Sequence, residues 1–206
     1  MTKRSLRHRP RGNRRGRGLL PQPGAAALLA AVALAATACS TALPAINAAP
    51  ASPAAPAPPA QLDGPYRVTR VVDGDTLWIS RGGSDEKLRL IGVDTPELHD
   101  PRTPVECYAQ QASDYTKSLQ GQQIYLETDP SQDSIDRYGR TLAYVWTGDR
   151  HLINYELIAA GYAHEYTYNT PYRYQTAFQA AEDHARTASV GLWSPANCPA
   201  DAPTRR

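Results

Sequence analysis

The chain has 206 residues, with 22 Lys and Arg against 20 Asp and Glu, a formal net charge of +2 at pH 7. Eight of the basic residues lie within residues 1–17 and no acidic residue precedes Asp63, so the remainder carries 14 basic against 20 acidic side chains, a net charge of −6. This acidic balance excludes a broad basic face for a polyanion, and any contact with nucleic acid must come from a local cluster.

Residues 1–38 have the features of a secretory signal peptide: a basic start, an Ala- and Leu-rich run, and small residues before Cys39. The apolar run is too short and too rich in Ala to be a convincing membrane span. Cys39 also resembles the lipid-attachment cysteine of bacterial lipoproteins, although Ala36 stands where Leu is usual. We therefore expect an exported protein, either freely secreted or anchored to the outer face of the membrane by a lipid on Cys39.

Residues 39–62 are rich in Ala and Pro, which favours an extended, semi-rigid linker. Residues 63–194 are long enough for one compact domain with a single core, and 195–206 form a C-terminal tail. Alternating apolar residues predict strands over 66–72, 76–80 and 87–93, with a turn at 73–75 and a loop at 81–86.

The second half of the domain mixes helices and strands. Helical periodicity predicts a helix over 104–119, and alternation returns over 123–129 and 141–147. Two further helices are expected over 152–160, ended by Gly161, and over 171–188, begun by Pro171. Five strands with helices between and after them indicate an α+β fold, a five-stranded OB-fold barrel with three helices.

The chain has three cysteines. If Cys39 carries a lipid or lies in the linker, Cys107 and Cys198 remain as a pair. Two cysteines of one exported domain are more often bridged than free, so we expect a disulfide between Cys107 and Cys198.

Arg89 lies within the predicted strand over 87–93. Strand alternation places it on the same face as Ile91 and Val93. An arginine on a half-buried face needs a partner, and a carboxylate or a phosphate is the usual one.

Four short stretches carry unusual polar side chains, and each alone has an ordinary explanation as a turn, a helix start or packing. They are DGDT (73–76), RLIGVDTPE (89–97), DRYGR (136–140) and the aromatic run EYTYNTPYRY (165–174). Together with Trp193-Ser194, their order and spacing resemble the staphylococcal nuclease (thermonuclease) family over about 71–194. The resemblance implies the same five-stranded barrel with three helices.

The resemblance also implies a Ca²⁺ site formed by Asp75, Asp94 and the backbone carbonyl of Thr95. Oxygen ligands, two of them carboxylates, suit this hard cation. The turn at 73–75 then has two functions: Asp73 is expected to shape the turn, and Asp75 to bind the metal.

By the same resemblance, Arg89 and Arg140 would hold the scissile phosphate, because guanidinium groups match phosphate geometry and oppose the charge that develops on its oxygens. Glu97 would act as general base or orient the attacking water. These positions are intact, which favours an enzyme over the alternative, a non-catalytic nucleic-acid- or protein-binding domain of the same fold.

The activity implied is hydrolysis of DNA and RNA with little base preference, leaving 3′-phosphate ends; phosphate contacts carry no sequence information. Side chains expected to contact the nucleotide, partly by stacking, are Arg137, Tyr138, Tyr166 and Tyr168. The residues after Glu97 are poor in lysine compared with the family, so we expect a modest dependence of binding on salt. We also expect a monomer, with no metal bound by the histidines.

Overall fold

The computed structural model describes residues 52–204 with the exception of Arg102. The chain divides into two units, residues 1–46 and 47–206, and the described residues belong to the second. The expected signal peptide, most of the linker and Cys39 lie outside the described residues. Among the residues that are described, no helix has the length and apolarity needed to cross a membrane.

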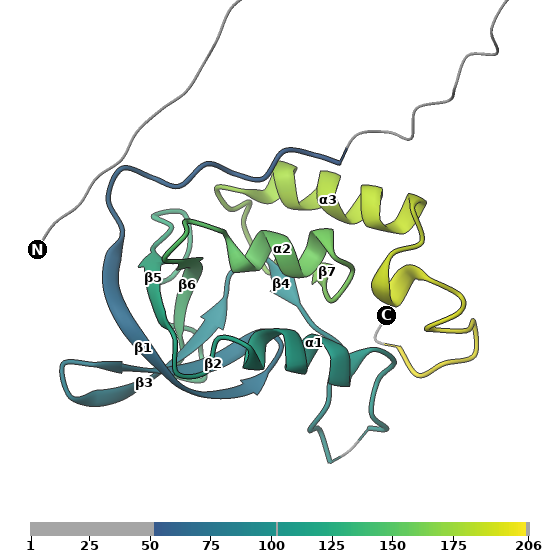
Figure 1. The fold of residues 1–206 in the computed structure, drawn as a ribbon, viewed down its shortest axis with the longest axis horizontal. Helices are drawn as coiled ribbons and strands as arrows, with labels where there is room; N and C mark the ends of the chain where they lie inside the picture. Colours follow the sequence, from purple (N-terminus) through teal and green to yellow (C-terminus); the bar gives the residue numbers. More distant parts are fainter. Residues whose placement is uncertain (1–51, 102, 205–206) are drawn as a thin grey trace, which may run out of the picture. The chain divides into compact units, whose positions relative to one another are not determined.

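Five strands form a closed barrel in the order β1-β2-β3-β6-β5 (Figure 1). Their bounds are β1 Asp63–Asp73, β2 Thr76–Arg81, β3 Ser84–Leu90, β5 Gln123–Glu127 and β6 Thr141–Thr147. β3 and β6 pair in parallel, and the other neighbours pair antiparallel. The five-stranded barrel expected from the sequence is confirmed.

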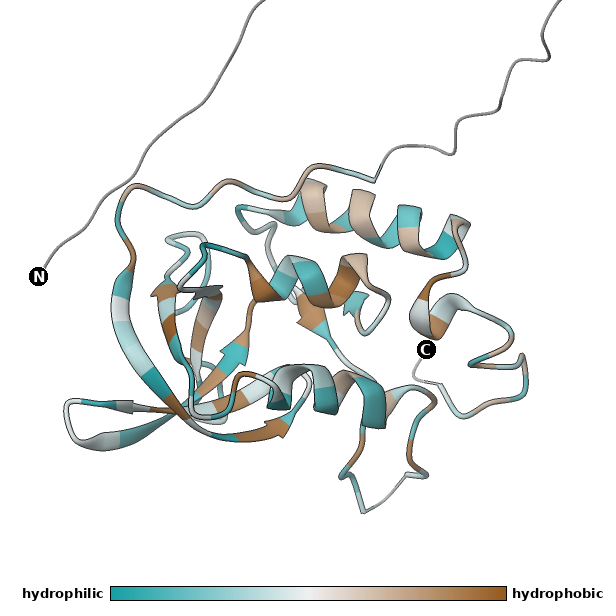
Figure 2. Ribbon diagram, in the orientation of Figure 1, coloured by the Kyte–Doolittle hydropathy of each residue, from teal (hydrophilic) through white to brown (hydrophobic). Residues whose placement is uncertain are grey.

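The barrel closes over an apolar core. Figure 2 shows hydrophobic and hydrophilic bands of colour along the strands, and the buried strand residues form the core. They include Val68, Leu77, Leu88, Ile124 and Val145, none of which is exposed to solvent. Burial of such side chains provides the main driving force for closing the sheet.

Three helices complete the domain: α1 Ala109–Lys117, α2 Ile153–Ala159 and α3 Gln175–Thr187. α1 packs against β1, while α2 contacts both β6 and α3 (Figure 1). Phe178 of α3 is fully buried and stacks among tyrosine rings. A short 3-10 helix, η1 Gly191–Trp193, follows α3.

Two predicted helices begin later than the sequence suggests. The helix expected from residue 104 begins at Ala109, because Tyr108 has a left-handed backbone with φ of 69°. The helix expected from Pro171 begins at Gln175, and Tyr172 instead lies buried against the core. In both cases the helical pattern of apolar residues begins several residues before the backbone becomes helical.

The strand expected over 87–93 is interrupted at Gly92, which has φ of 75°. A Cβ there would lie 2.6 Å from the ring of Tyr172, so only glycine fits. The chain then enters β4 Val93–Asp94, which pairs with β7 His164–Glu165. The loop expected at 81–86 is shorter than predicted: β3 begins at Ser84, after a turn of Gly82 and Gly83.

A disulfide joins Cys107 and Cys198, the pair expected from the sequence, across 91 residues with a Cα–Cα distance of 5.8 Å. The backbone N–H of Cys107 also donates to the carbonyl of Pro203 at 2.7 Å. The C-terminal tail is thus fastened next to the start of α1.

Candidate active site

The turn between β1 and β2 carries the first acidic residue of the site. Asp73 pairs with Thr76, so Gly74 and Asp75 form the turn itself. A Cβ on Gly74 would lie 2.6 Å from Cγ2 of Thr95, which means that glycine is required for the Thr95 loop to approach. Thr116 of α1 is fully buried, and its hydroxyl donates to the carbonyl of Gly74 at 2.6 Å, which fixes the turn against α1.

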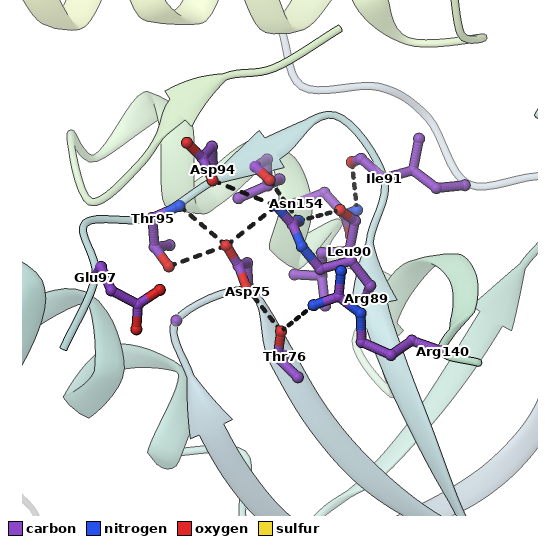
Figure 3. Close-up of polar contacts among 12 residues, drawn as sticks. Asp75, Thr76, Arg89, Leu90, Ile91, Asp94, Thr95, Glu97, Arg140 and Asn154 are labelled. Carbon is purple, nitrogen blue, oxygen red and sulfur yellow. Dashed lines mark hydrogen bonds and ion pairs between the residues drawn. The ribbon is translucent and has the colours of Figure 1, made fainter. Parts of the chain in front are cut away.

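Asp75 is held by its neighbours on both carboxylate oxygens. Its Oδ2 accepts the backbone N–H of Thr95 at 3.1 Å and the Thr95 hydroxyl at 3.2 Å. Its Oδ1 accepts the Thr76 hydroxyl at 2.8 Å (Figure 3). The side chain therefore has one fixed orientation at the end of the barrel, and it is only 7% exposed.

Arg89 lies between Asp75 and Asp94. Its Nη2 is 3.3 Å from Oδ2 of Asp75 and 3.4 Å from Oδ1 of Asp94 (Figure 3). Its Nη1 donates to the carbonyls of Leu90 at 2.8 Å and Val93 at 2.5 Å. The partner expected for Arg89 from strand alternation is present, although the turn at Gly92, and not a continuous strand face, brings Asp94 to it.

The loop that carries Asp94 and Thr95 is fixed by Asn154, which is fully buried at the start of α2. Its amide nitrogen donates to the carbonyl of Ile91 at 2.9 Å, and its oxygen accepts the N–H of Val145 at 2.8 Å. Neither Asn154 nor Thr116 was predicted from the sequence. For Asn154 the available signal was an amide side chain among the largely apolar buried residues of α2.

Glu97 follows β4, and Figure 3 shows its carboxylate on the same side of the site as Asp75. Its backbone is held twice by Glu106: the N–H of Glu97 donates to Oε2 at 2.7 Å, and its carbonyl accepts the N–H of Glu106 at 3.0 Å. Its Oε1 accepts the backbone N–H of His99 at 3.0 Å. Glu106 is a positioning residue that the sequence analysis missed.

Arg140 reaches the site from the start of β6. Because Thr141, the first residue of β6, pairs with Leu88 near the end of β3, Arg140 lies at the same end of the barrel as Arg89. Its Nη1 donates to the Thr76 hydroxyl at 3.4 Å, so a single hydroxyl links Arg140 to Asp75.

Asp136 positions Arg140 and was also missed. Its Oδ2 accepts Nε of Arg140 at 2.7 Å and lies 2.6 Å from Nη2. Burial raises the pKa of Asp136, but hydrogen bonds from Arg140 and from the N–H of Tyr138 outweigh it, and the pKa is lowered. The carboxylate is thus ionised and pairs with the guanidinium, and the spacing of four residues was the signal available in the sequence.

The residues expected to contact a nucleotide gather on the exposed surface beside Arg140. Tyr138, Tyr166 and Tyr168 are 67%, 44% and 61% exposed. The Arg137 guanidinium lies 4.8 Å from the Tyr138 ring, and Arg140 lies 5.2 Å from the same ring. The ring centres of Tyr166 and Tyr168 are 6.3 Å apart. The pKa of Arg137 is raised, mainly by its hydrogen bond with Tyr138 and to a smaller extent by Tyr168 and Tyr166.

The acidic pair fits a hard cation. Two carboxylates, Asp75 and Asp94, face the Arg89 guanidinium at a site that also presents backbone oxygens. Among the described residues, no group of three or more His, Cys, Asp or Glu side chains could hold a metal. A cation here would therefore take its remaining ligands from carbonyl, water or substrate oxygens, which suits Ca²⁺ better than a transition metal.

Fold and site together define an OB-fold barrel whose one end carries acidic oxygens, a glutamate and two arginines, a combination suited to a phosphate ester. The family model described as Staphylococcal nuclease homologue matches residues 87–195. The chain therefore belongs to the staphylococcal nuclease family. The matched segment includes every site residue from Arg89 onward, and Asp75 precedes it.

Curated relatives agree with the family match. The chain is 44% identical to a thermonuclease of Staphylococcus hyicus over 130 residues, which cover 63% of this chain and 75% of the relative. It is 43% identical to a thermonuclease of Staphylococcus intermedius over 129 residues, or 62% and 75% of the two chains. The endonuclease YncB of Bacillus subtilis is 34% identical over 127 residues, or 61% and 59%.

Proposed function

We propose that this chain is a calcium-dependent nuclease that hydrolyses phosphodiester bonds of DNA and RNA with little sequence preference and leaves 3′-phosphate ends. Membership of the staphylococcal nuclease family, and relatives named thermonuclease and endonuclease, support a nuclease. The observation that carries the finer proposal is that both arginines meet at Asp75. Arg89 contacts the Asp75 carboxylate directly, and Arg140 contacts it through the Thr76 hydroxyl.

Asp75, Asp94 and the carbonyl of Thr95 would hold Ca²⁺. When bound, the cation supplies charge neutralisation at the phosphate and alignment of its oxygens. The carboxylates need little reorganisation to receive it, because Thr95 and Thr76 already fix the orientation of Asp75. The nearness of two carboxylates, Asp75 and Asp94, at one point of the site supports a cation at this position.

Arg89 and Arg140 would hold the scissile phosphate and oppose the negative charge that accumulates on its oxygens during attack. Each guanidinium is fixed in advance, Arg89 by two backbone carbonyls and Arg140 by Asp136. Fixed donors lose little entropy on binding and do not have to reorganise as the charge develops.

Glu97 would accept the proton of the attacking water, or orient that water, from its place beside Asp75. The double contact with Glu106 limits its backbone motion. Tyr138, Tyr166 and Tyr168, with Arg137, would contact the nucleotide by stacking and polar contacts. Because the reacting groups contact phosphate and not base edges, weak base preference follows.

One incubation tests the proposal. The purified protein is mixed with plasmid DNA and with RNA, in Ca²⁺, in Mg²⁺ or in EDTA, and the ends of the products are analysed. Degradation of both substrates with Ca²⁺, absent in EDTA and leaving 3′-phosphate ends, is expected. No degradation under any metal condition would leave the non-catalytic binding domain as the better interpretation.

We also propose that the protein acts outside the cytoplasm as a monomer, either secreted or lipid-anchored at Cys39. The basic and apolar N-terminal segment and the pairing of Cys107 with Cys198 support export. Mass spectrometry of the mature protein from its host distinguishes the two forms, since a diacylglyceryl group on Cys39 adds a large, defined mass.

A further inference from the structure

An open cavity of about 380 Å³ lies on the outside of the barrel, next to α1. Inside the barrel, Leu77 and Ile79 are fully buried, so Trp78 between them points outward. We call this cavity the Trp78 groove; besides two valines of β1 it is lined by Arg70, Trp78, Lys87, His99 and Lys117.

Strand register brings two cations to one aromatic ring. Trp78 of β2 pairs with Arg70 on β1 and with Lys87 on β3. The Arg70 guanidinium lies 5.0 Å from the centre of the indole ring, and the Lys87 amine lies 5.9 Å from it. Both distances are within the range of a cation–π contact, which holds a cation by attraction to the ring.

These two cations differ from five other arginines of the domain, which are paired with carboxylates. Arg81, Arg89, Arg140, Arg173 and Arg186 each lie within 4.0 Å of a carboxylate. Within the part of the chain that the structure describes, Arg70 and Lys87 form no such ion pair. An indole ring orients a cation without cancelling its charge, so the groove keeps positive charge on a domain that is acidic as a whole.

The groove adjoins the candidate active site through His99. The backbone N–H of this residue donates to Oε1 of Glu97 at 3.0 Å, and its Nδ1 lies 3.0 Å from Oδ1 of Asp73. Asp73 is the last residue of β1, directly before the turn that carries Asp75. A strand that leaves the site past Glu97 therefore meets the groove next.

We propose that the Trp78 groove binds phosphates of the nucleic-acid strand that continues beyond the scissile bond, with Arg70 and Lys87 as the phosphate contacts and Trp78 as their positioning residue. This inference rests on the proposed function, since it assigns a second binding region for the same substrate. It also supplies the local basic cluster that the acidic composition of the domain requires for binding nucleic acid.

Binding is measured without cleavage, in EDTA, by fluorescence anisotropy of labelled oligothymidylates of 3 and 12 nucleotides. The wild-type protein is expected to bind the 12-mer more tightly than the 3-mer. In the double variant Arg70→Ala/Lys87→Ala, we expect about tenfold weaker binding of the 12-mer and unchanged binding of the 3-mer. The slope of log affinity against log salt for the 12-mer should fall by about 1.4, or about 0.7 for each phosphate that the variant no longer neutralises.

A matched control comes from the same strand. Arg67 of β1 is exposed and lies outside the groove, so Arg67→Ala removes one positive charge from the same strand as Arg70→Ala and should change neither the affinity nor the salt slope. Trp78→Phe keeps an aromatic ring and should retain most of the 12-mer affinity, whereas Trp78→Leu should lose it. A purely structural role of Trp78 predicts equal losses in the two variants.

The proposal is overturned if the double variant binds the 12-mer as tightly as the wild type, or if Arg67→Ala weakens binding equally. It is also overturned if the double variant loses only binding to phosphatidylglycerol vesicles and keeps its affinity for the oligonucleotide. If the double variant shows the expected loss of 12-mer affinity but the wild-type protein cleaves nothing in Ca²⁺, the proposed function fails and the groove is still the part of the domain that binds the strand.

Discussion

Two acidic pairs in this domain have similar chemistry and opposite surroundings. Glu127 and Asp129 lie at the end of β5, and hydrogen-bond donors occupy both oxygens of each carboxylate. Glu127 accepts from Trp146, Arg173 and Tyr174. Asp129 accepts from Tyr144, Ser131 and the N–H of Arg173. Asp75 and Asp94 both contact the Arg89 guanidinium at the candidate active site. The first pair, the saturated pair, is held by donors from within the fold, whereas the second, the open pair, is the one proposed to bind a metal. The comparison separates acidic residues that stabilise the fold from acidic residues proposed to bind a ligand.

The largest effect expected is on catalysis. Glu97→Gln should lower the rate of DNA cleavage by about 10² to 10⁴-fold, because an amide cannot accept a proton as a carboxylate does. Its oxygen can still accept the N–H of His99, so the free energy of unfolding should change by less than about 0.5 kcal/mol. Rates under saturating Ca²⁺ and urea unfolding curves measure the two. Asp114→Asn, on the exposed face of α1, is the control, and equal rates in the two variants would remove Glu97 from the mechanism.

The saturated pair should respond in the opposite way. All four hydrogen bonds to the Asp129 side chain are donated to it, and the single oxygen of an asparagine can accept only part of them. Asp129→Asn should therefore lower the free energy of unfolding by about 2 to 3 kcal/mol, with cleavage per folded molecule unchanged. The exposed neighbour Asp133, changed to Asn, should have no measurable effect. A loss of activity without a loss of stability would erase the distinction between the two pairs.

An intermediate effect is expected at the open pair. Asp75→Asn should weaken Ca²⁺ binding at least about tenfold, or about 1.4 kcal/mol, as measured by calorimetric titration of the metal. Asp73→Asn changes the same turn and should leave the Ca²⁺ affinity within about twofold, since Asp73 is expected to shape the turn and not to bind the metal. Unchanged affinity in Asp75→Asn would assign this aspartate to the fold alone.

The smallest effect concerns pH. Burial raises the pKa of Asp129, but hydrogen bonds from Arg173, Ser131 and Tyr144 outweigh it, and the pKa is lowered from its usual 3.8. A depressed pKa contributes stability above the unfolded value, and this contribution is lost as pH falls through the folded value. The stability difference between wild type and Asp129→Asn should therefore be constant above about pH 5 and shrink below about pH 4. Urea unfolding between pH 3 and 7 measures it; a constant difference throughout contradicts the assignment.

Local pattern was sufficient for the barrel strands, whereas the candidate site residues were predicted from the resemblance of four short motifs to a known family. Strand alternation located β1, β2, β5 and β6, and the need of Arg89 for a partner could be argued from its half-buried face. The supporting residues were not visible in this way. Thr116 bonds Gly74 across 42 residues and Asn154 bonds Ile91 across 63, so their roles depend on contacts that exist only after the chain has folded.

The predicted helix starts, and the predicted continuous strand through Gly92, were wrong for a related reason. Apolar periodicity reports which side chains are buried, and it does not report where the backbone leaves helical or extended geometry. Tyr108 and Gly92 both have positive φ; Tyr108 follows the disulfide-bonded Cys107, and Gly92 lies against the Tyr172 ring. At Gly92 this deviation matters for function, since it directs Asp94 toward Arg89.

The disulfide between Cys107 and Cys198 turns the second half of the domain into a covalent ring. The ring contains the three helices, β5, β6 and Arg140, whereas β1 to β4, with Asp75, Arg89 and Glu97, lie outside it. The candidate active site thus straddles the boundary of the ring. The backbone that enters the ring at Cys107 joins the two parts of the site covalently. All other contacts between these two parts are noncovalent, among them the parallel pairing of β3 with β6 and the Thr76–Arg140 hydrogen bond. Closing the ring restricts the unfolded chain, but assembly of the site still requires the open N-terminal strands to dock onto it.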